Sequence, residues 1–309
     1  MTTINTTLTS VTARMLASAE ILRALQAKAP LCVSYGAGVD STAVLVGLWM
    51  LGITPDLITF ADTGGEKPET YKFFDVINAW LVSVGFPEVV VVKRARTARA
   101  PYSTLEENCL VNATLPSLAF GGRKGCSQKW KREPLDAYRA KWQPAKAAWA
   151  RGERVTVLIG YDAGPKDARR SSIADDRKYH YEYPLRLWGW DRAECERRIA
   201  TAGLAVPAKS ACYFCPANKV AEIAKLVDEQ PELADRIIAM EAAAEPRQTE
   251  RRAAGKKAIE GLWGMGCKGT RGGEKRPGRM GEFITAYRAG RSLPVIQSVR
   301  ASNCGGCGL

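Results

Sequence analysis

The sequence predicts an α/β fold built around a doubly wound, mostly parallel sheet. Apolar runs of strand length alternate with helix-length segments, and a glycine-rich turn joins the first strand to the next helix. The VVVV run at 89–92 is continuously apolar, as in strands that are buried on both faces. This alternation is typical of right-handed βαβ units with helices on both sides of the sheet.

The individual elements follow in order along the chain. The expected strands are 31–35, 56–61, 88–92 and 155–160, and the expected helices are 14–28, 40–51, 68–84, 131–151 with a break at Pro144, 191–202, 217–228 and 231–244. Asp191 and Glu194 form a capping-box-like start for the helix at 191–202. A cysteine-bearing loop spans 207–216.

Three regions are expected from this order. A helical lead-in occupies 1–29, an α/β domain of Rossmann-like architecture occupies 30–220, and 221–309 forms a helical, basic, glycine-rich region with a cysteine tail. After Pro246 the composition shifts to glycine, lysine and arginine, which predicts a long loop.

Length and composition indicate an ordinary globular protein. The 309 residues are 46% apolar and 25% charged, which suffices for a sizeable core. No run of 18 apolar residues appears, and the first residues lack the order of a secretory signal. We therefore expect a soluble, cytoplasmic protein with no membrane partner.

The positive charge is concentrated near the C-terminus. The formal net charge is +13, and segment 246–300 holds 13 Lys and Arg against four Glu, so that it contributes 13 − 4 = +9. Such a segment can bind a polyanion such as tRNA or DNA, or it can be a solvated tail. Charge alone leaves both interpretations open.

One histidine and nine cysteines narrow the chemistry. With His180 as the only imidazole, His-rich zinc sites and most histidine general bases are disfavoured. An odd number of cysteines without an export signal disfavours a disulfide framework and favours metal or redox chemistry.

The segment from Ser34 to Ser41, SYGAGVDS, has the pattern of a phosphate-binding loop. Gly36 and Gly38 let the backbone approach an anion, and the following helix directs its positive N-terminus toward it. The two serine hydroxyls can donate further hydrogen bonds. Asp40 fits beside a phosphate only if it also holds Mg²⁺ or caps backbone donors.

Two other loop types were weighed against this one. A Walker-type loop needs GxxxxGK[ST], which the sequence lacks. A dinucleotide fingerprint is nearly matched by Gly36, Gly38 and Ser41, with Asp62 placed to meet a ribose, but its third glycine is missing.

The loop resembles the PP-loop, SGGxDS, of the adenine nucleotide α-hydrolase-like superfamily, with Gly36 and Ala37 in place of the usual Ser and Gly. The blocks FADTGGEKPETYKFF at 60–74, CSQKWKREPL at 126–135 and GYDAGPKDARR at 160–170 are similar to those of the phosphoadenosine phosphosulfate (PAPS) reductase family. Together these blocks cover roughly residues 30–220.

The resemblance implies that ATP, or a sulfonucleotide such as PAPS or adenylylsulfate (APS), binds at the carboxyl ends of the strands. Asp62 and Thr63 would lie beside the nucleotide. Lys166, Arg169 and Arg170 would face its phosphates or sulfate, with Asp40 and Lys166 as catalytic residues.

Three cysteines resemble those of the iron–sulfur members of this family. Cys212 and Cys215 form a CxxC pair, and Cys126 stands in the family's other cysteine block. The resemblance implies a [4Fe–4S] cluster, although thiolates suit zinc equally well. The fourth iron of the cluster then has an open coordination position, or Cys267, Cys304 or Cys307 supplies its ligand.

Three functions are compatible with these patterns. The first is an ATP pyrophosphatase and sulfurtransferase that adenylates an acceptor, such as a nucleic acid, so that a sulfur donor can displace AMP. The second is a sulfonucleotide reductase that uses thioredoxin, because the terminal Cys307-Gly308-Leu309 resembles the catalytic tail of PAPS reductases. The third is a non-catalytic nucleic-acid-binding accessory protein.

Overall fold

The computed structural model describes residues 2–116, 125–168, 170, 172–264 and 276–291, and their side chains except those of 2–10 and 166. The chain forms two compact units and passes between them several times. The first unit comprises 1–62, 67–92 and 132–210, and the second comprises 63–66, 93–131 and 211–309. The predicted domain boundaries at 29 and 220 stay a prediction.

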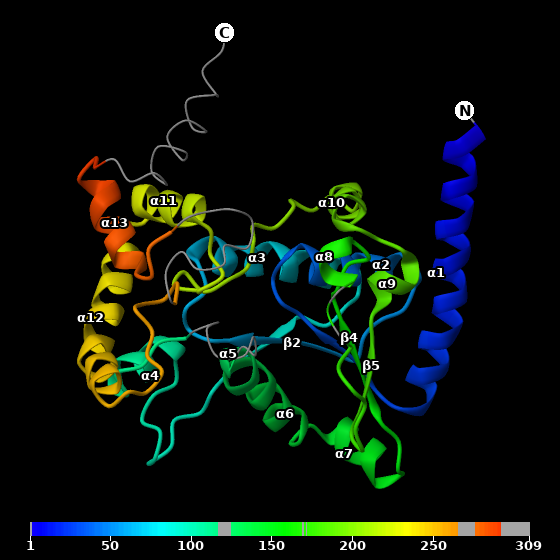
Figure 1. The fold of residues 1–309 in the computed structure, drawn as a ribbon. Helices are drawn as coiled ribbons and strands as arrows, with labels where there is room; N and C mark the ends of the chain where they lie inside the picture. The colour runs from blue at the N-terminus through cyan, green and yellow to red at the C-terminus, as the bar shows by residue number, and fades with distance from the viewer. Residues whose placement is uncertain (1, 117–124, 169, 171, 265–275, 292–309) are drawn as a thin grey trace. The chain divides into compact units, whose positions relative to one another are not determined.

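A five-stranded sheet forms the centre of the first unit (Figure 1). Its spatial order is β3-β2-β1-β4-β5, and β1 pairs in parallel with both β2 and β4. The fifth strand also runs parallel to its neighbour β4. The strand bounds are β1 Leu31–Ser34, β2 Leu57–Asp62, β3 Val89–Lys93, β4 Val155–Ile159 and β5 Tyr179–Glu182.

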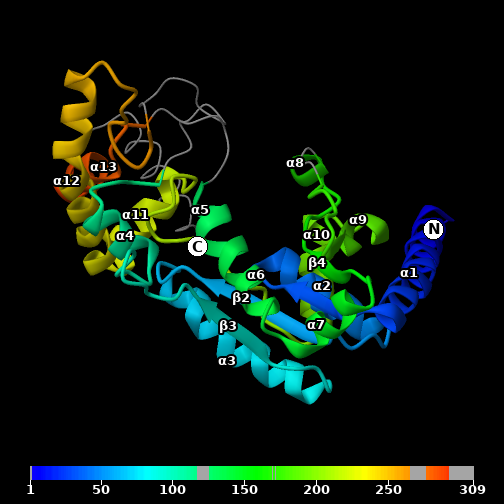
Figure 2. The same cartoon turned by 90° about the horizontal axis from the view of Figure 1, so that it is seen from below.

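Helices cover both faces of this sheet (Figures 1 and 2), which confirms the doubly wound α/β fold. Leu31 and Val33 of β1 pack into a cluster with α1, α2, α3, α9 and α10, whereas Cys32 between them packs into a second cluster with α7. The helices of this unit are α1 Thr2–Lys28, α2 Val39–Met50, α3 Pro68–Ser83, α6 Glu133–Arg139, α7 Gln143–Ala150, α8 Pro165–Ala168, α9 Pro184–Trp188 and α10 Arg192–Thr201.

The sheet order creates a switch point between β1 and β4. From β1 the chain proceeds outward through β2 and β3, and then returns to the other side of β1 to form β4 and β5. The loops that leave the carboxyl ends of two such strands diverge and leave a crevice, which is where open α/β sheets bind ligands.

All four predicted strands are present within one or two residues of their expected ends, whereas β5 was not predicted. Its sequence YHYE carries no aliphatic residue, but Tyr179 and Tyr181 alternate toward the core and are buried. The predicted break at Pro144 is confirmed as a gap between α6 and α7, with Pro144 in the first turn of α7.

The second unit is mostly helical in its described part. One apolar cluster, which includes Phe214, Leu262 and Phe283, joins α4, α11, α12 and α13. Its helices are α4 Leu105–Val111, α5 Gly125–Ser127, the π-helical η1 Gln128–Arg132, α11 Val220–Glu229, α12 Pro231–Ala253 and α13 Met280–Arg288.

The predicted end of the helix at 231–244 is wrong, because α12 continues through Pro246 to Ala253. A proline inside a helix removes one backbone hydrogen bond. Burial of Ala244 before it and Gln248 after it keeps this stretch packed against the core and offsets that loss. No described helix of the protein has the length and apolar character needed to cross a membrane.

A buried carboxylate organises the C-terminal part of the second unit. Glu241 of α12 is 5% exposed and accepts hydrogen bonds from the backbone N–H groups of Leu262 at 2.8 Å, Met280 at 3.0 Å and Gly281 at 2.8 Å. It therefore ties the loop before α13, and the first turn of α13 itself, to α12. A Cβ at Gly261 would lie 2.5 Å from the Glu241 carboxylate, so this close approach requires glycine there.

Glu241→Gln is expected to lower the free energy of unfolding by about 1–3 kcal/mol, because the amide NH₂ would face buried backbone donors that the carboxylate now satisfies. Urea unfolding followed by circular dichroism measures this change. Glu250→Gln, an exposed position on the same helix, is the control and should be neutral. Equal stabilities of the two variants would contradict the organising role of Glu241.

Candidate functional site

The loop predicted to bind phosphate connects β1 to α2, as expected. Gly38 is the residue before the first turn of α2, and its N–H donates to the Ser41 hydroxyl at 3.4 Å, while that hydroxyl donates to the Gly38 carbonyl at 3.1 Å. Ala37 has a φ of 53°, in the left-handed region that favours glycine. Ala37 is therefore a strained residue in this loop.

The end of β4 lies directly against this loop. A Cβ built on Gly160 would lie 2.8 Å from the backbone nitrogen of Ser41 and 2.9 Å from the carbonyl carbon of Asp40. Only a glycine lets the two backbones come this close. The contact fixes the segment after β4 beside the N-terminus of α2.

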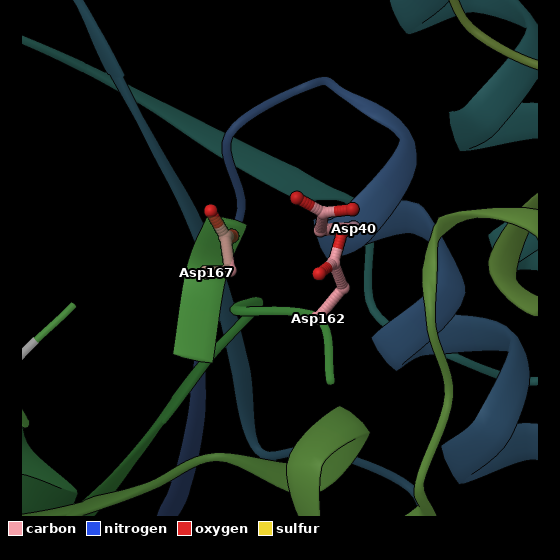
Figure 3. A group of neighbouring side chains, drawn as sticks. All are labelled: Asp40, Asp162 and Asp167. Carbon is pink, nitrogen blue, oxygen red and sulfur yellow. The ribbon is translucent and has the colours of Figure 1, made fainter. Parts of the chain in front are cut away.

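Three carboxylates meet at this point (Figure 3). Asp40 comes from the first turn of α2, Asp162 from the segment after β4 and Asp167 from α8. One oxygen of each lies within 4.8 Å of one oxygen of each of the others. The side chains of Asp162 and Asp167 are only 9% and 6% exposed. Such a group of oxygens offers the hard ligands that Mg²⁺ prefers.

Two arginines partly neutralise these carboxylates. Arg192, the first residue of α10, places Nη1 3.1 Å from Asp40 Oδ1 and donates from Nη2 to Asp40 Oδ2 at 3.2 Å. Arg170 Nε lies 3.0 Å from Asp167 Oδ1. Burial, with Asp162 and Asp167 nearby, raises the pKa of Asp40 to about 6, although Arg192 acts in the opposite direction. Ionisation of Asp40 beside Asp162 and Asp167 is therefore disfavoured in the protein.

Ser34 and Asp62, both predicted to contact the nucleotide, have protein partners. The buried Arg139 of α6 donates to Ser34 Oγ at 3.0 Å and to Thr59 Oγ1 at 3.2 Å, which are paired residues of β1 and β2. Tyr71 donates from its hydroxyl to Asp62 Oδ1 at 2.8 Å. Both residues lie at the carboxyl ends of their strands, where the prediction placed them.

Thr63, predicted to lie beside the nucleotide, contacts a cysteine of the second unit. Its Oγ1 is 3.1 Å from Cys212 Sγ. The backbones of Glu66 and Cys212 form an antiparallel bridge, and Tyr213 N–H donates to the Gly65 carbonyl at 2.8 Å. The TGGE segment at 63–66 thus pairs with the cysteine-bearing loop.

The CxxC pair lies in a tight turn of that loop. Cys215 N–H donates to the Cys212 carbonyl at 2.9 Å, and the buried Asn218 donates from Nδ2 to the same carbonyl at 3.1 Å. Burial raises the pKa of Cys212 to about 12, and Glu66 acts in the same direction, while Lys131 opposes it. In the protein alone, Cys212 is a neutral thiol.

The third predicted cysteine, Cys126, lies in α5 and packs on the same apolar cluster as Cys212. Of the potential metal ligands that the structure describes, only Asp40, Asp162 and Asp167 form a group of three or more within 4.8 Å. The cluster at Cys126, Cys212 and Cys215 therefore remains a prediction. Arg169, Cys267, Cys304, Cys307 and the side chain of Lys166 lie outside the described part of the chain.

The described arginines of the basic segment 246–300 make contacts within the second unit. Arg251 and Arg276 donate to backbone carbonyls, and Arg252 and Arg279 pair with Glu245. Arg288 pairs with Asp235. Part of the positive charge that suggested a nucleic-acid partner thus stabilises the local structure.

His180, the only imidazole of the sequence, lies on β5, which is the edge strand beside β4. Its Nδ1 is 2.7 Å from Asp175 Oδ2 and its Nε2 is 2.9 Å from Glu182 Oε1. Burial opposes protonation, but hydrogen bonds to Asp175 and Glu182 outweigh it and raise the pKa of His180. This arrangement fits a surface ion pair on the edge strand.

Sequence reasoning missed Asp162, Asp167 and Arg192. The two aspartates belong to the GYDAGPKDARR block, in which only the basic residues had been singled out. Their position after a buried strand was the available signal, since carboxyl ends of adjacent parallel strands meet at one edge. Nothing in the local sequence of α10 points to Arg192.

No protein-family model matches the sequence, and no curated protein matches it. Among solved structures, the protein is similar to phosphoadenylyl-sulfate (PAPS) reductase from Candida auris, determined as a phosphate complex. That likeness has 20% sequence identity and a TM-score of 0.34, and it covers 61% of this chain and 81% of the reductase chain. At this level of similarity the fold class rests on the sheet order described above.

Gly160→Ala is expected to displace the loop at 36–41, because its Cβ would overlap the backbone of Asp40 and Ser41. We expect a loss of about 1–3 kcal/mol in the free energy of unfolding, as for other overpacked sites. Thermal unfolding measures it. Gly125→Ala, where a Cβ meets no atom within 4 Å, is the control. A Gly160→Ala protein as stable as this control would show that the close approach is not required.

Proposed function

We propose that this protein is a PP-loop enzyme of the PAPS reductase-like family that binds ATP with Mg²⁺ and releases pyrophosphate while adenylating an acceptor. The observation that carries this proposal is the group of three carboxylates at the switch point, beside the loop at 36–41. A helix N-terminus alone suits any small anion. The carboxylates add a requirement for a cation.

The carboxylates favour ATP over a sulfonucleotide. Asp40, Asp162 and Asp167 would repel a bare phosphate or sulfate placed next to them. ATP is bound in enzymes as its Mg²⁺ complex, in which the metal lies between carboxylates and phosphate oxygens. A sulfonucleotide that binds without a metal would face these three carboxylates directly.

Each part of the site would have a distinct role. Asp40, Asp162 and Asp167 would hold Mg²⁺, which supplies neutralisation of the charge on the departing pyrophosphate. The N–H groups at the start of α2 would bind phosphate oxygens, and Arg170 would add positive charge beside Asp167. Lys166 and Arg169, from the same GYDAGPKDARR sequence block, are proposed to contact the pyrophosphate.

The acceptor would be adenylated and then attacked by sulfur. Adenylation converts an oxygen into a good leaving group, AMP, which a sulfur donor can displace. We propose tRNA or DNA as the class of acceptor, because the segment 246–300 carries 13 Lys and Arg against four Glu. Thioredoxin-dependent release of sulfite through Cys307 would instead identify a sulfonucleotide reductase.

The first test is conversion of ATP to AMP and pyrophosphate by the purified full-length chain with MgCl₂, with and without tRNA or DNA. Asp40→Asn should abolish turnover, and Asp75→Asn, an exposed position on α3, should keep it. Absence of ATP turnover together with sulfite release from PAPS would overturn the proposal. Turnover that survives Asp40→Asn would overturn the role of Asp40.

The same variant has an expected effect on stability. The pKa of Asp40 in the folded protein, about 6, lies above its ordinary value of 3.8. Protonated Asp40 therefore stabilises the folded state at low pH, and this contribution to the free energy of unfolding is lost as pH rises through about 6. Asn resembles the protonated form, so Asp40→Asn should unfold at a higher temperature than the parent at pH 8 without Mg²⁺. A lower unfolding temperature would show that the ion pair with Arg192 outweighs this penalty.

We also propose that Cys212 and Cys215, with Cys126, hold an iron–sulfur cluster, with zinc as the alternative metal. The tight turn at 212–215 and the partly buried Cys126 on the same apolar cluster support this proposal. The donor set is all thiolate, which suits either metal. When bound, the metal would hold Cys212 as a thiolate despite its raised pKa.

Anaerobic purification should yield protein with bound iron and sulfide and with broad absorption in the visible range. Cys212→Ala and Cys215→Ala should lose both, whereas Cys195→Ala, buried in the first unit, should retain them. Zinc in place of iron would identify the alternative metal. Iron content unchanged in the Cys212→Ala protein would contradict the assignment.

A further inference from the structure

We infer that Arg192 couples the binding of Mg²⁺ to the binding of the nucleotide. Its guanidinium pairs with the carboxylates that would hold the metal, and with Mg²⁺ and nucleotide bound it would pair with a phosphate instead. This inference rests on the proposed function and adds a mode of regulation to the same site.

The geometry places Arg192 directly over two of the three carboxylates. Both terminal nitrogens approach Asp40, at 3.1 and 3.2 Å from its two oxygens, and Nε lies 3.8 Å from Asp162 Oδ2. Of these contacts with Asp40, the one from Nη2 is a hydrogen bond, whereas Oδ1 is buried and has no hydrogen-bond partner among the described residues. Arg192 therefore lies within 4 Å of two of the three carboxylates.

This ion pair is not needed to hold α10 in place. Asp191 caps the helix by accepting from Glu194 N–H at 2.9 Å, and Cys195 and Ile199 are fully buried against α2. The side chain of Arg192 itself is 50% exposed, and ion pairs at such exposure contribute little to stability. Arg192 can therefore change partners without unfolding its helix.

Charge explains why it would change partners. Mg²⁺ bound at Asp40 and Asp162 would lie close to the guanidinium, and the two positive charges repel. A phosphate group offers the same planar, bidentate pairing as a carboxylate. Once a phosphate is present, Arg192 can leave Asp40 and keep a full set of charged hydrogen bonds.

Two consequences follow for binding. Without nucleotide, Mg²⁺ must displace Arg192 into water and binds weakly. With nucleotide, Arg192 has a new partner and Mg²⁺ binds more tightly, and by linkage Mg²⁺ tightens nucleotide binding by the same factor. Arg192 would make the site respond to the Mg²⁺-nucleotide complex rather than to either component.

The test measures Mg²⁺ affinity by isothermal titration calorimetry, with MgCl₂ as titrant, in the presence and absence of an ATP analogue with a methylene α,β-bridge. In the parent protein we expect the analogue to tighten Mg²⁺ binding by roughly tenfold or more, within the usual range of coupling. In Arg192→Gln, Mg²⁺ should bind the free protein more tightly and the analogue should bind less tightly. The ratio of the two Mg²⁺ affinities, which is the factor by which the analogue tightens Mg²⁺ binding, should therefore be smaller in Arg192→Gln than in the parent, and the part that remains reflects direct contact between Mg²⁺ and the phosphates.

Arg197→Gln, on the same helix and 60% exposed, is the matched control and should keep the parent ratio. Arg192→Lys retains the charge without the bidentate pairing and should give an intermediate ratio. An Arg192→Gln protein with the parent ratio would overturn the inference and leave the proposed function intact, as would binding of both ligands to the parent without coupling. A parent protein that binds neither Mg²⁺ nor the analogue would overturn both.

Discussion

The contact between the end of β4 and the first turn of α2 is the constraint on which the site depends. With no side chain at position 160, the backbone after β4 reaches the peptide between Asp40 and Ser41. That approach brings Asp162 and Asp167 close to Asp40, and it places the segment after β4 against the loop at 36–41. The loops that follow β1 and β4 can meet in this way because these two strands are paired neighbours in the sheet.

The sequence predicted the parts of the molecule that depend on local signals. Apolar strands, the glycine-rich turn and the start of α10 at Asp191 each occupy a short stretch whose preferences agree with the fold. Asp40 could be singled out because an acidic residue is unexpected in an anion-binding loop. The short polar strand β5 lacked such a signal, and the course of α12 through Pro246 is decided by packing rather than by proline's own preference.

The remaining features of the site arise from contacts between distant parts of the chain. Asp40 meets Asp162 only because the strand order places β4 beside β1, and Arg192 joins them only because α10 packs on α2. Similarly, Thr63 and Cys212 are 149 positions apart. Such pairs cannot be found from spacing, and the contact of Thr63 with a thiol is one of them.

The single histidine gives this protein a built-in spectroscopic reporter. His180 contributes the only imidazole resonances in the proton NMR spectrum of the chain, so they need no assignment by mutation. The ring is held between Asp175 and Glu182, on the strand at one edge of the sheet. Its raised pKa means that this pairing stabilises the fold at acidic pH and loses its effect as pH rises through that pKa. Detachment of β5 would return the titration to that of a free imidazole, which separates fraying of this edge from unfolding of the whole sheet.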